Sequence, residues 1–169
     1  SKSPDIFNSA FIADNISANY IRILAHTVEE AIDSFHTFGL SGMNVTAPYK
    51  ESIINFLDEL SSEAKEIGGV NTIVNKNGRL IGYNTDYYGV VQSLIHAKIS
   101  LKNRSCVVVG AGGAGKAAAY GLVRAGAKVT IVNRTLEKVQ ALASAFKCEY
   151  AGFDDLQKII ENSEIIVLT

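Results

Sequence analysis

Short apolar runs alternate with longer amphipathic segments through the second half of the chain. The apolar runs lie at residues 105–109, 128–132, 148–150 and 165–168, and the segments with helical periodicity lie at 113–124, 135–146 and 153–160. Continuous β-branched runs are typical of strands buried on both faces, and each parallel strand needs a crossover before the next. The alternation therefore predicts an α/β fold with a parallel, doubly wound sheet and right-handed crossovers.

The first half of the chain predicts a further α/β lobe of βαβ-like organisation. Strands are expected at residues 20–25 and 40–45, a β-hairpin at 70–74 and 80–83, and helices at 51–60, at 61–67, from Ser3, from Thr27 to Gly39 and from Asp86. Ser3 is the expected N-cap of the first helix, and Thr27 with Glu30 predicts a capping box for the second. The first helix would bury one apolar stripe, made of Ile6, Phe7, Ala10 and Phe11.

A polar stretch at residues 97–104 predicts the joint between two lobes. We expect a first lobe at residues 1–100 and a second at residues 101–169. The chain opens without a methionine and stops on the apolar run 165–168, where a parallel strand would need a following connection. These two ends indicate a fragment that is truncated on both sides.

A glycine-rich turn joins the first strand of the second lobe to its helix. Gly110, Gly112 and Gly115 match G-x-G-x-x-G, in which the first glycine permits a sharp turn, the second lets a pyrophosphate approach, and the third allows close helix packing. The helix from Gly113 offers unpaired N–H groups to that anion. The turn therefore predicts a dinucleotide site, with a purely structural βαβ turn as the alternative. The cofactor-binding residues expected here are Gly110, Ala111, Gly112, Gly113 and Ala114.

The end of the second strand indicates which dinucleotide is bound. NAD sites place a carboxylate there, whereas NADP sites supply an arginine for the 2′-phosphate. Here Asn133 is followed by Arg134, then by Thr135 as a helix cap and by Lys138 one turn later. These four residues favour NADP. The alternative is a solvated arginine and lysine at a helix start.

Composition and charge exclude several classes of partner. The 169 residues carry 16 basic and 17 acidic side chains, so no basic field favours nucleic acid or a membrane surface, and no apolar run approaches the length of a membrane span. Cys106 and Cys148 lie in apolar runs and are expected to be reduced core residues, as in a cytoplasmic protein. Neither these cysteines nor the three histidines have metal-ligand spacing, so we expect no metal site.

Two polar stretches of the first lobe carry candidate chemistry. Asn44, Thr46 and Lys50 follow a predicted strand, where α/β proteins bind ligands, although a lysine ahead of a helix is more often solvated than catalytic. Asp86 follows the hairpin at a helix start. Its alternative role is that of a dipole partner, worth under about 1 kcal/mol.

Six stretches, in order along the chain, resemble the shikimate dehydrogenase family. They are Ser1-Lys2-Ser3-Pro4 with Asn8, Asn44-Val45-Thr46-Ala47-Pro48-Tyr49-Lys50, Val70-Asn71-Thr72-Ile73, Gly82-Tyr83-Asn84-Thr85-Asp86 with Gly89, Gly110-Ala111-Gly112-Gly113-Ala114, and Asn133-Arg134-Thr135. The resemblance implies an α/β substrate lobe followed by a Rossmann-like NADP lobe. It also implies the interconversion of 3-dehydroshikimate and shikimate in aromatic amino-acid biosynthesis.

The resemblance also implies roles for individual residues. Ser1 and Ser3 would hold the substrate carboxylate, Thr46 and Asn71 would meet ring hydroxyls, and Lys50 and Asp86 would do so as the catalytic pair. The chemistry suits such a pair, because an alcohol that loses a hydride to nicotinamide must also lose a proton.

The chain departs from the family pattern at a few positions. Phe7 stands where the family usually has histidine, Gly69 where it usually has alanine, and Gly115 where alanine is frequent. The family's first strand and its C-terminal segment are absent, so this fragment alone is expected to bind little. Three alternatives stay open: an NAD-using quinate/shikimate dehydrogenase, a ligand-binding or regulatory module without turnover, and a structural fragment. The whole protein could be a homodimer or one segment of a larger multifunctional enzyme.

Overall fold

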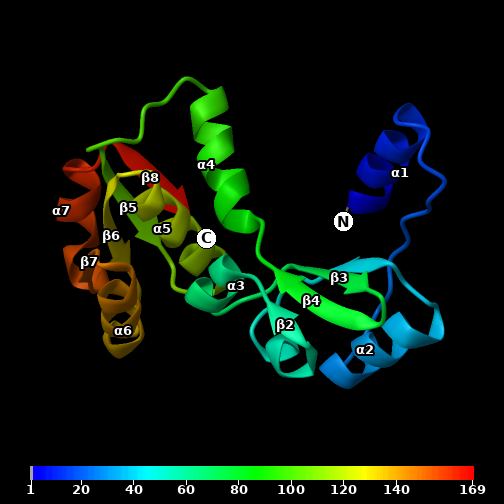
Figure 1. The fold of residues 1–169 in the computed structure, drawn as a ribbon. Helices are drawn as coiled ribbons and strands as arrows, with labels where there is room; N and C mark the ends of the chain where they lie inside the picture. Colours follow the sequence, from blue (N-terminus) through cyan, green and yellow to red (C-terminus); the bar gives the residue numbers. More distant parts are fainter. Residues whose placement is uncertain (1) are drawn as a thin grey trace. The chain divides into compact units, whose positions relative to one another are not determined.

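The structure, a computed structural model, describes residues 2–169 (Figure 1). Within the described residues the chain divides into two compact units, one that ends at Leu40 and one that comprises Ser41–Thr169. No helix in the described part of the chain has both the length and the apolar character that a membrane crossing requires.

The first unit contains helices α1, Ser3–Ala13, and α2, Val28–Thr37. The predicted capping of α2 is confirmed in part. Thr27 Oγ1 accepts the N–H of Glu30 at 3.1 Å. In a complete capping box the Glu30 carboxylate would also accept the N–H of Thr27. Here it accepts the N–H of His26, one residue earlier, at 2.7 Å.

The predictions for α1 need correction. The helix begins at Ser3 itself, so Lys2 occupies the N-cap position and no side chain caps the helix. None of the residues of α1 is buried, and the predicted apolar stripe is therefore wrong. Phe7 lies flat on Tyr20 instead, with ring centroids 4.6 Å apart.

The strand predicted at residues 20–25 is also wrong. A strand needs a neighbour to complete its hydrogen bonds, and no strand lies among the described residues up to Leu40. Asn8 holds the backbone of Tyr20 instead: Tyr20 N–H donates to Asn8 Oδ1 at 2.7 Å, and its carbonyl accepts from Asn8 Nδ2 at 3.0 Å.

The second unit starts with a mixed sheet in the order β1-β3-β4-β2. Its strands are β1, Gly42–Asn44, β2, Glu59–Leu60, β3, Thr72–Lys76, and β4, Arg79–Tyr83. β3 is antiparallel to both β1 and β4, and β2 is parallel to β4. The βαβ-like unit expected at residues 20–45 is not formed, because residues 20–25 form no strand and β1 pairs antiparallel with β3. Because β1 and β4 run in one direction and β3 in the other, the ends of β1 and β4 meet the start of β3 at one edge.

The predicted hairpin is confirmed, whereas one predicted helix is not. Asn77 and Gly78 both have positive φ, the conformation that an Asn-Gly hairpin turn requires. The expected helix at residues 51–60 is replaced by a 3₁₀ turn, η1, Ser52–Phe56, and by β2. Hydrogen bonds at Asp58 explain this difference, because its N–H donates to the carbonyl of Leu80 and its carboxylate accepts the Leu80 N–H. Helix α3, Ser62–Ile67, has the Ser61 side chain as its N-cap.

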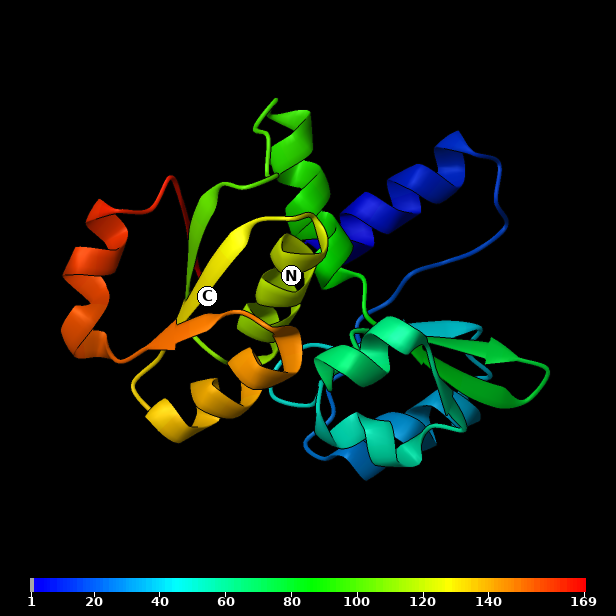
Figure 2. The same ribbon diagram turned by 60° about the vertical axis from the view of Figure 1, so that its left-hand side comes forward.

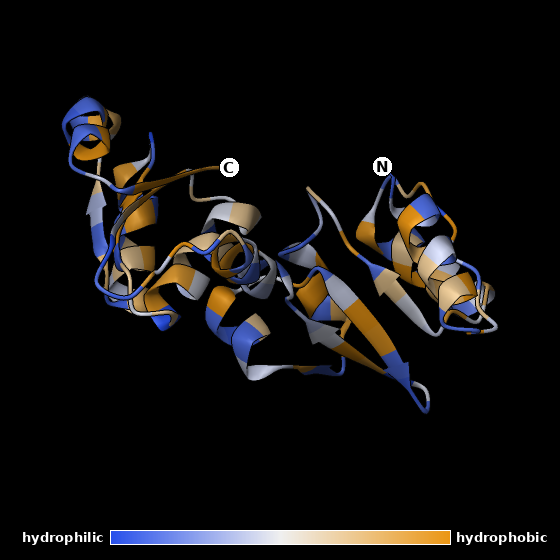
Figure 3. Ribbon diagram, turned by 90° about the horizontal axis from the view of Figure 1, so that it is seen from above, coloured by the Kyte–Doolittle hydropathy of each residue, from blue (hydrophilic) through white to orange (hydrophobic). Residues whose placement is uncertain are grey.

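The second sheet is parallel throughout, as predicted, and has the strand order β7-β6-β5-β8 (Figures 1 and 2). Its elements are β5, Ser105–Val109, α5, Gly113–Arg124, β6, Lys128–Val132, α6, Leu136–Phe146, β7, Glu149–Ala151, η2, Phe153–Asp155, α7, Leu156–Glu161, and β8, Ile165–Leu168. Buried apolar residues occur in β5, β6 and β8, among them Val107, Val108, Val129, Ile131 and Ile165, and Figure 3 colours the chain by hydropathy. The strand order reverses between β5 and β8. Ligands of open α/β sheets bind at the carboxyl ends of strands at such a switch point.

Helix α4, Asp86–His96, connects the two sheets and packs along α5. A Cβ on Gly121 would lie 2.7 Å from the carbonyl oxygen of Tyr87, so glycine permits this close approach. Val90 and Leu94 are partly buried against the core, whereas Ile95 is exposed. The α4–α5 contact fixes the start of α4 relative to the glycine-rich turn.

Candidate active site

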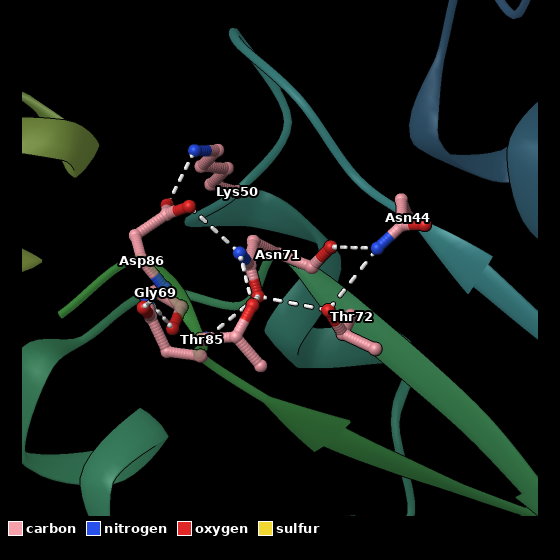
Figure 4. Close-up of polar contacts among 8 residues, drawn as sticks. Asn44, Lys50, Gly69, Asn71, Thr72, Thr85 and Asp86 are labelled. Atoms are coloured by element: carbon pink, nitrogen blue, oxygen red, sulfur yellow. Dashed lines mark hydrogen bonds and ion pairs between the residues drawn. The ribbon is translucent and has the colours of Figure 1, made fainter. Parts of the chain in front are cut away.

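Lys50 and Asp86 form an ion pair at the edge where β1 and β4 end (Figure 4). The Lys50 Nζ atom lies 2.6 Å from Asp86 Oδ2. Lys50 follows β1 after a short loop, and Asp86 is the first residue of α4, just beyond β4. The two side chains are 18% and 30% exposed, so the pair is screened from most of the solvent but still accessible to a small ligand.

Asn71 links the carboxylate of this pair to the start of β3 (Figure 4). Its Nδ2 donates to Asp86 Oδ1 at 2.8 Å and to Thr85 Oγ1 at 2.9 Å, and its Oδ1 accepts the N–H of Thr85 at 2.9 Å. Each carboxylate oxygen of Asp86 therefore has one nitrogen donor. Asn71 is 9% exposed, whereas Thr85 is exposed and the Asp86 side chain is 30% exposed, so these bonds are partly shielded from water.

Thr72 and Asn44 extend the network along the sheet edge. Thr72 Oγ1 donates to Asn71 Oδ1 at 2.9 Å and accepts from Asn44 Nδ2 at 3.2 Å. Asn44 was a candidate on sequence grounds, whereas the roles of Thr72 and Thr85 were missed. Both stand beside predicted site residues, in the V-N-T and N-T-D stretches, and this adjacency was the available signal.

Asn84 was also missed by the sequence analysis. Its side chain is buried, with 4% of the residue exposed. Its Nδ2 donates to the carbonyl of Gly69 at 3.0 Å, and its Oδ1 accepts the N–H of Asp86 at 3.0 Å. The available signal was a polar residue next to an apolar hairpin. This signal for Asn84 is weak, because asparagine is common in turns and at helix caps.

Three further residues, Thr46, Ser3 and Ser1, were predicted to contact the substrate. Thr46 is exposed on the loop after β1, and no hydrogen bond of its hydroxyl is found within residues 2–169. Ser3 lies in α1, within the first unit. Ser1 lies outside the described residues.

The three motif glycines have three different environments. Gly110 has φ +116°, which favours glycine, and a Cβ there would lie 2.4 Å from Thr169 Oγ1. A Cβ on Gly115 would lie 2.2 Å from the carbonyl oxygen of Gly110, so glycine allows α5 to approach the strand. Among the described residues, a Cβ on Gly112, the N-cap of α5, would meet nothing within 4 Å. The open space at Gly112 adjoins the helix N-terminus, where an anion fits.

The residues after β6 lie at the same carboxyl edge of the parallel sheet. Arg134 and Lys138 are exposed, and no carboxylate stands at the end of β6. Thr135 occupies the N-cap position of α6, but its side chain makes no capping bond, so its predicted capping role is wrong. Asn133 Nδ2 donates to the carbonyl of Thr135 at 3.4 Å within the same turn.

The Lys50 segment contacts the glycine-rich turn directly. A Cβ on Gly113, the first residue of α5, would lie 3.4 Å from Lys50 Cδ. The next residue, Glu51, pairs with Lys116 of α5 through an Oε1–Nζ distance of 2.8 Å. The ion pair and the anion-accepting turn are therefore neighbours within Ser41–Thr169.

A cavity of about 380 Å³ lies on the sheet face beside the network. Its lining includes Thr72, Val74, Tyr83, Asn84 and Thr85, and neither Lys50 nor Asp86. Within residues 2–169, no three histidine, cysteine, aspartate or glutamate side chains lie close enough to hold a metal ion. The polar network, rather than this cavity, therefore carries the groups suited to proton transfer.

A parallel sheet in this order, with an open glycine turn at its switch point and a lysine–carboxylate pair beside it, defines a Rossmann-type α/β protein of the dehydrogenase class. Family models agree: residues 1–73 match the shikimate dehydrogenase substrate binding domain, and residues 93–169 match shikimate / quinate 5-dehydrogenase. The chain belongs to the shikimate dehydrogenase family.

Individual relatives give the extent of the similarity. The chain is 40% identical to a shikimate dehydrogenase (NADP(+)) of Caldanaerobacter subterraneus, over 100% of this chain and 64% of the relative. The crystal structure of shikimate dehydrogenase from Aquifex aeolicus matches with 39% identity and a TM-score of 0.91, over 100% of this chain and 64% of that one. The Thermus thermophilus shikimate 5-dehydrogenase in complex with NADP(H) and shikimate matches with 32% identity and a TM-score of 0.88, over 100% and 63%. The chain thus spans less than two thirds of these relatives' length.

Proposed function

We propose that the protein containing this chain is an NADP-dependent shikimate dehydrogenase, which interconverts shikimate and 3-dehydroshikimate in aromatic amino-acid biosynthesis. The observation that carries this proposal is the Lys50–Asp86 pair, 2.6 Å apart and next to the glycine-rich turn. An alcohol dehydrogenase needs a proton acceptor and a dinucleotide close together. The names of the curated relatives support the same activity.

The lobes proposed for this function are residues 1–100 for substrate and residues 101–169 for NADP. The two family models support this division, because the substrate-binding model ends at residue 73 and the second model starts at residue 93. A cytoplasmic location, a homodimer and a place in a multifunctional enzyme stay predictions.

The residues of the glycine-rich turn fit a dinucleotide pyrophosphate. Gly112 leaves open space at the N-terminus of α5, and the N–H groups of this first turn have no intrahelical acceptors. The proposed pyrophosphate contacts come from Gly110 to Ala114. When bound, NADP supplies hydride acceptance and donation.

Arg134 and Lys138 are the proposed partners of the 2′-phosphate, with Asn133 and Thr135 completing the turn. Both cations are exposed, and exposed guanidinium groups bind phosphate bidentately. Asn133 replaces the carboxylate that would bind the 2′-hydroxyl of NAD and repel a phosphate. This charge pattern supports NADP over NAD.

The proposed substrate contacts are Ser1 and Ser3 for the carboxylate, and Thr46, Asn71, Lys50 and Asp86 for the hydroxyls. The neutral amine of Lys50 receives the proton that the reacting hydroxyl loses on oxidation, and the ammonium formed in this way returns it on reduction. Asp86 orients the amine, since its Oδ2 accepts a hydrogen bond from Nζ. Asn71 in turn fixes the carboxylate by donating to Oδ1.

The test measures NADPH formation at 340 nm by the longest natural protein that contains this chain. Shikimate with NADP is compared with quinate and NAD, for the wild type, Lys50→Ala and the control Lys65→Ala, which removes an exposed lysine of α3. We expect reduction with shikimate and NADP, and a loss of about 10²- to 10⁴-fold in Lys50→Ala only.

Other outcomes separate the alternatives. Preferred turnover of quinate with NAD would establish the quinate-type alternative, which the second family model, shikimate / quinate 5-dehydrogenase, also covers. Measurable shikimate binding without reduction of either dinucleotide would refute the enzyme assignment and indicate a binding module.

A further inference from the structure

Asn84 lies between the two segments that carry the ion pair. Its side chain is buried, and both of its polar ends bond to backbone: Nδ2 to the Gly69 carbonyl and Oδ1 to the Asp86 N–H, each at 3.0 Å. The Asp86 N–H is one of the first amides of α4 and has no intrahelical acceptor. Thr85, the N-cap residue, makes no side-chain capping bond, so Asn84 supplies that acceptor instead.

The Gly69 end of this bridge leads to Lys50. Val70, the next residue after Gly69, donates its N–H to the carbonyl of Lys50 at 2.7 Å. Gly69 itself is buried, and a Cβ there would lie 3.8 Å from both Asn84 Nδ2 and the Lys50 carbonyl oxygen. The Asn84 amide therefore lies against the backbone from which the catalytic lysine projects.

The ion pair completes a ring of contacts between the two segments. From the Lys50 carbonyl the contacts lead to Val70, and through Gly69 and Asn84 to the N–H of Asp86. The Lys50 Nζ atom, 2.6 Å from Asp86 Oδ2, joins the two ends. The Asp86 side chain can reach its partner only if the two backbone segments keep this spacing.

We propose that Asn84 is a positioning residue, which fixes the backbone of Asp86 relative to that of Lys50 and thereby sets the geometry of proton transfer. This inference rests on the proposed function and assigns a role to a residue that touches neither substrate nor cofactor. Alanine at position 84 would leave two buried backbone groups without a partner, and the two segments would drift apart. A misplacement of about 1 Å is enough to cost roughly 100-fold in rate.

The test compares wild type, Asn84→Ala and the control Asn75→Ala in the longest natural protein that contains this chain. Asn75 also accepts a backbone N–H, that of Gly78 at 2.8 Å, but in the hairpin turn away from the site. We expect kcat for shikimate oxidation to fall about 10- to 100-fold in Asn84→Ala, with the Kd of NADP unchanged. The solvent deuterium isotope effect on kcat should rise, because proton transfer becomes more rate-limiting. A smaller fraction of folded enzyme would leave that isotope effect unchanged.

Amide hydrogen exchange gives a readout that does not depend on activity. In Asn84→Ala, protection should fall about tenfold at Asp86 and also at Val70, whose N–H bonds to Lys50, while the Gly110 N–H bonded to Val132 keeps its protection. Unchanged protection at Val70, or a lower kcat with an unchanged isotope effect, would overturn the proposal. Absence of turnover in the wild type would refute the proposed function, and exchange at Val70 would still decide the role of Asn84.

Discussion

The methylene chain of Lys50 lies against Gly113, with 3.4 Å between Lys50 Cδ and the position that a Cβ on Gly113 would occupy. Gly113 is the first residue of α5 in the glycine-rich turn, and Lys50 holds Asp86 with its amine. The lysine of the polar network therefore takes its position partly from the turn proposed to bind the dinucleotide. A side chain introduced at residue 113 would therefore contact the methylene chain of Lys50.

Enlarging residue 113 in two steps should displace the Lys50 amine. In Gly113→Ala the added methyl makes an ordinary van der Waals contact, so we expect kcat to stay within about threefold of wild type. In Gly113→Val the extra methyl groups push the lysine away from Asp86, and kcat should fall about tenfold or more. Steady-state assays with shikimate and NADP measure both variants. Equal activity of the valine and alanine variants would contradict the contact.

The second sheet could be predicted from sequence because its signals are local. The run Val107-Val108-Val109 needs burial on both faces, and Gly110 marks the turn that follows it. The strand order, with β5 beside both β6 and β8, was not predicted, because the rule of right-handed crossovers sets the hand of each connection but not which strands are neighbours. Each local preference agrees with the global fold, so the elements themselves needed little tertiary information.

The elements that were predicted wrongly depend on contacts with residues distant in sequence. Residues 20–25 alternate like a strand, but no strand lies beside them among the described residues of their unit. Residues 59–60 lie between segments with helical periodicity, yet they pair with β4. A backbone hydrogen bond from Asp58 to Leu80 begins this pairing. In the candidate site, the motifs named Lys50, Asn71 and Asp86, whereas Asn84 could be found only through its burial and its two backbone bonds.

Alanine at residue 112 should weaken dinucleotide binding without unfolding the protein. Gly112 has φ −78° and ψ −174°, which alanine adopts readily, and its Cβ would project into the open space at the α5 N-terminus. We expect the Kd of NADP to rise about tenfold or more, since the methyl occupies the place of the pyrophosphate. Calorimetric titration with NADP measures the change.

The matched control is Gly152→Ala. Gly152 is also an N-cap, with φ −81° and ψ 174°, and a Cβ there would lie 3.9 Å from Leu136 Cδ1. Both variants should lose similar amounts of stability, about 1 kcal/mol or less, but Gly152→Ala should bind NADP normally. Equal NADP affinities for the two variants would argue against an anion at Gly112.

Arg134→Ala should change the choice of dinucleotide. The 2′-phosphate would lose a charge-assisted hydrogen bond, so the Kd of NADP should rise about 10- to 100-fold while that of NAD stays within about twofold. Lys128→Ala is the control, because it removes an exposed cation from the opposite end of β6. Fluorescence titration of wild type and both variants with each dinucleotide gives the six dissociation constants. A parallel loss of NAD and NADP affinity in Arg134→Ala would exclude selective contact with the 2′-phosphate.

Cys148 should make the protein less stable at alkaline pH. Burial raises the pKa of its thiol to about 11, and the nearby Glu149 carboxylate adds to the rise. The thiol of the unfolded chain has a pKa of about 8.5. The neutral buried thiol therefore contributes fully to the free energy of unfolding below about pH 8.5, and this contribution is lost as the pH rises to about 11. Urea unfolding at pH 7.5 and 10.5 should show a smaller loss for Cys148→Ala than for wild type. Identical losses in the two proteins would refute this linkage.

Substitution by alanine should raise the free energy of unfolding at Gly69 and lower it at Gly68. Gly69 lies outside the left-handed region, and a Cβ there would make only ordinary contacts, at 3.8–4.0 Å, with Asn84, Lys50 and Ile67. Gly69→Ala should therefore raise the free energy of unfolding by about 0.4–1 kcal/mol, because alanine restricts the unfolded chain. Gly68 ends α3 with φ +68° and ψ 39°, so Gly68→Ala should lower that free energy by about 1–2 kcal/mol. Urea unfolding measures both. Because Gly69 adjoins the Asn84 bridge, a destabilised Gly69→Ala would mean that the space beside Asn84 and the Lys50 carbonyl is tighter than these contacts indicate.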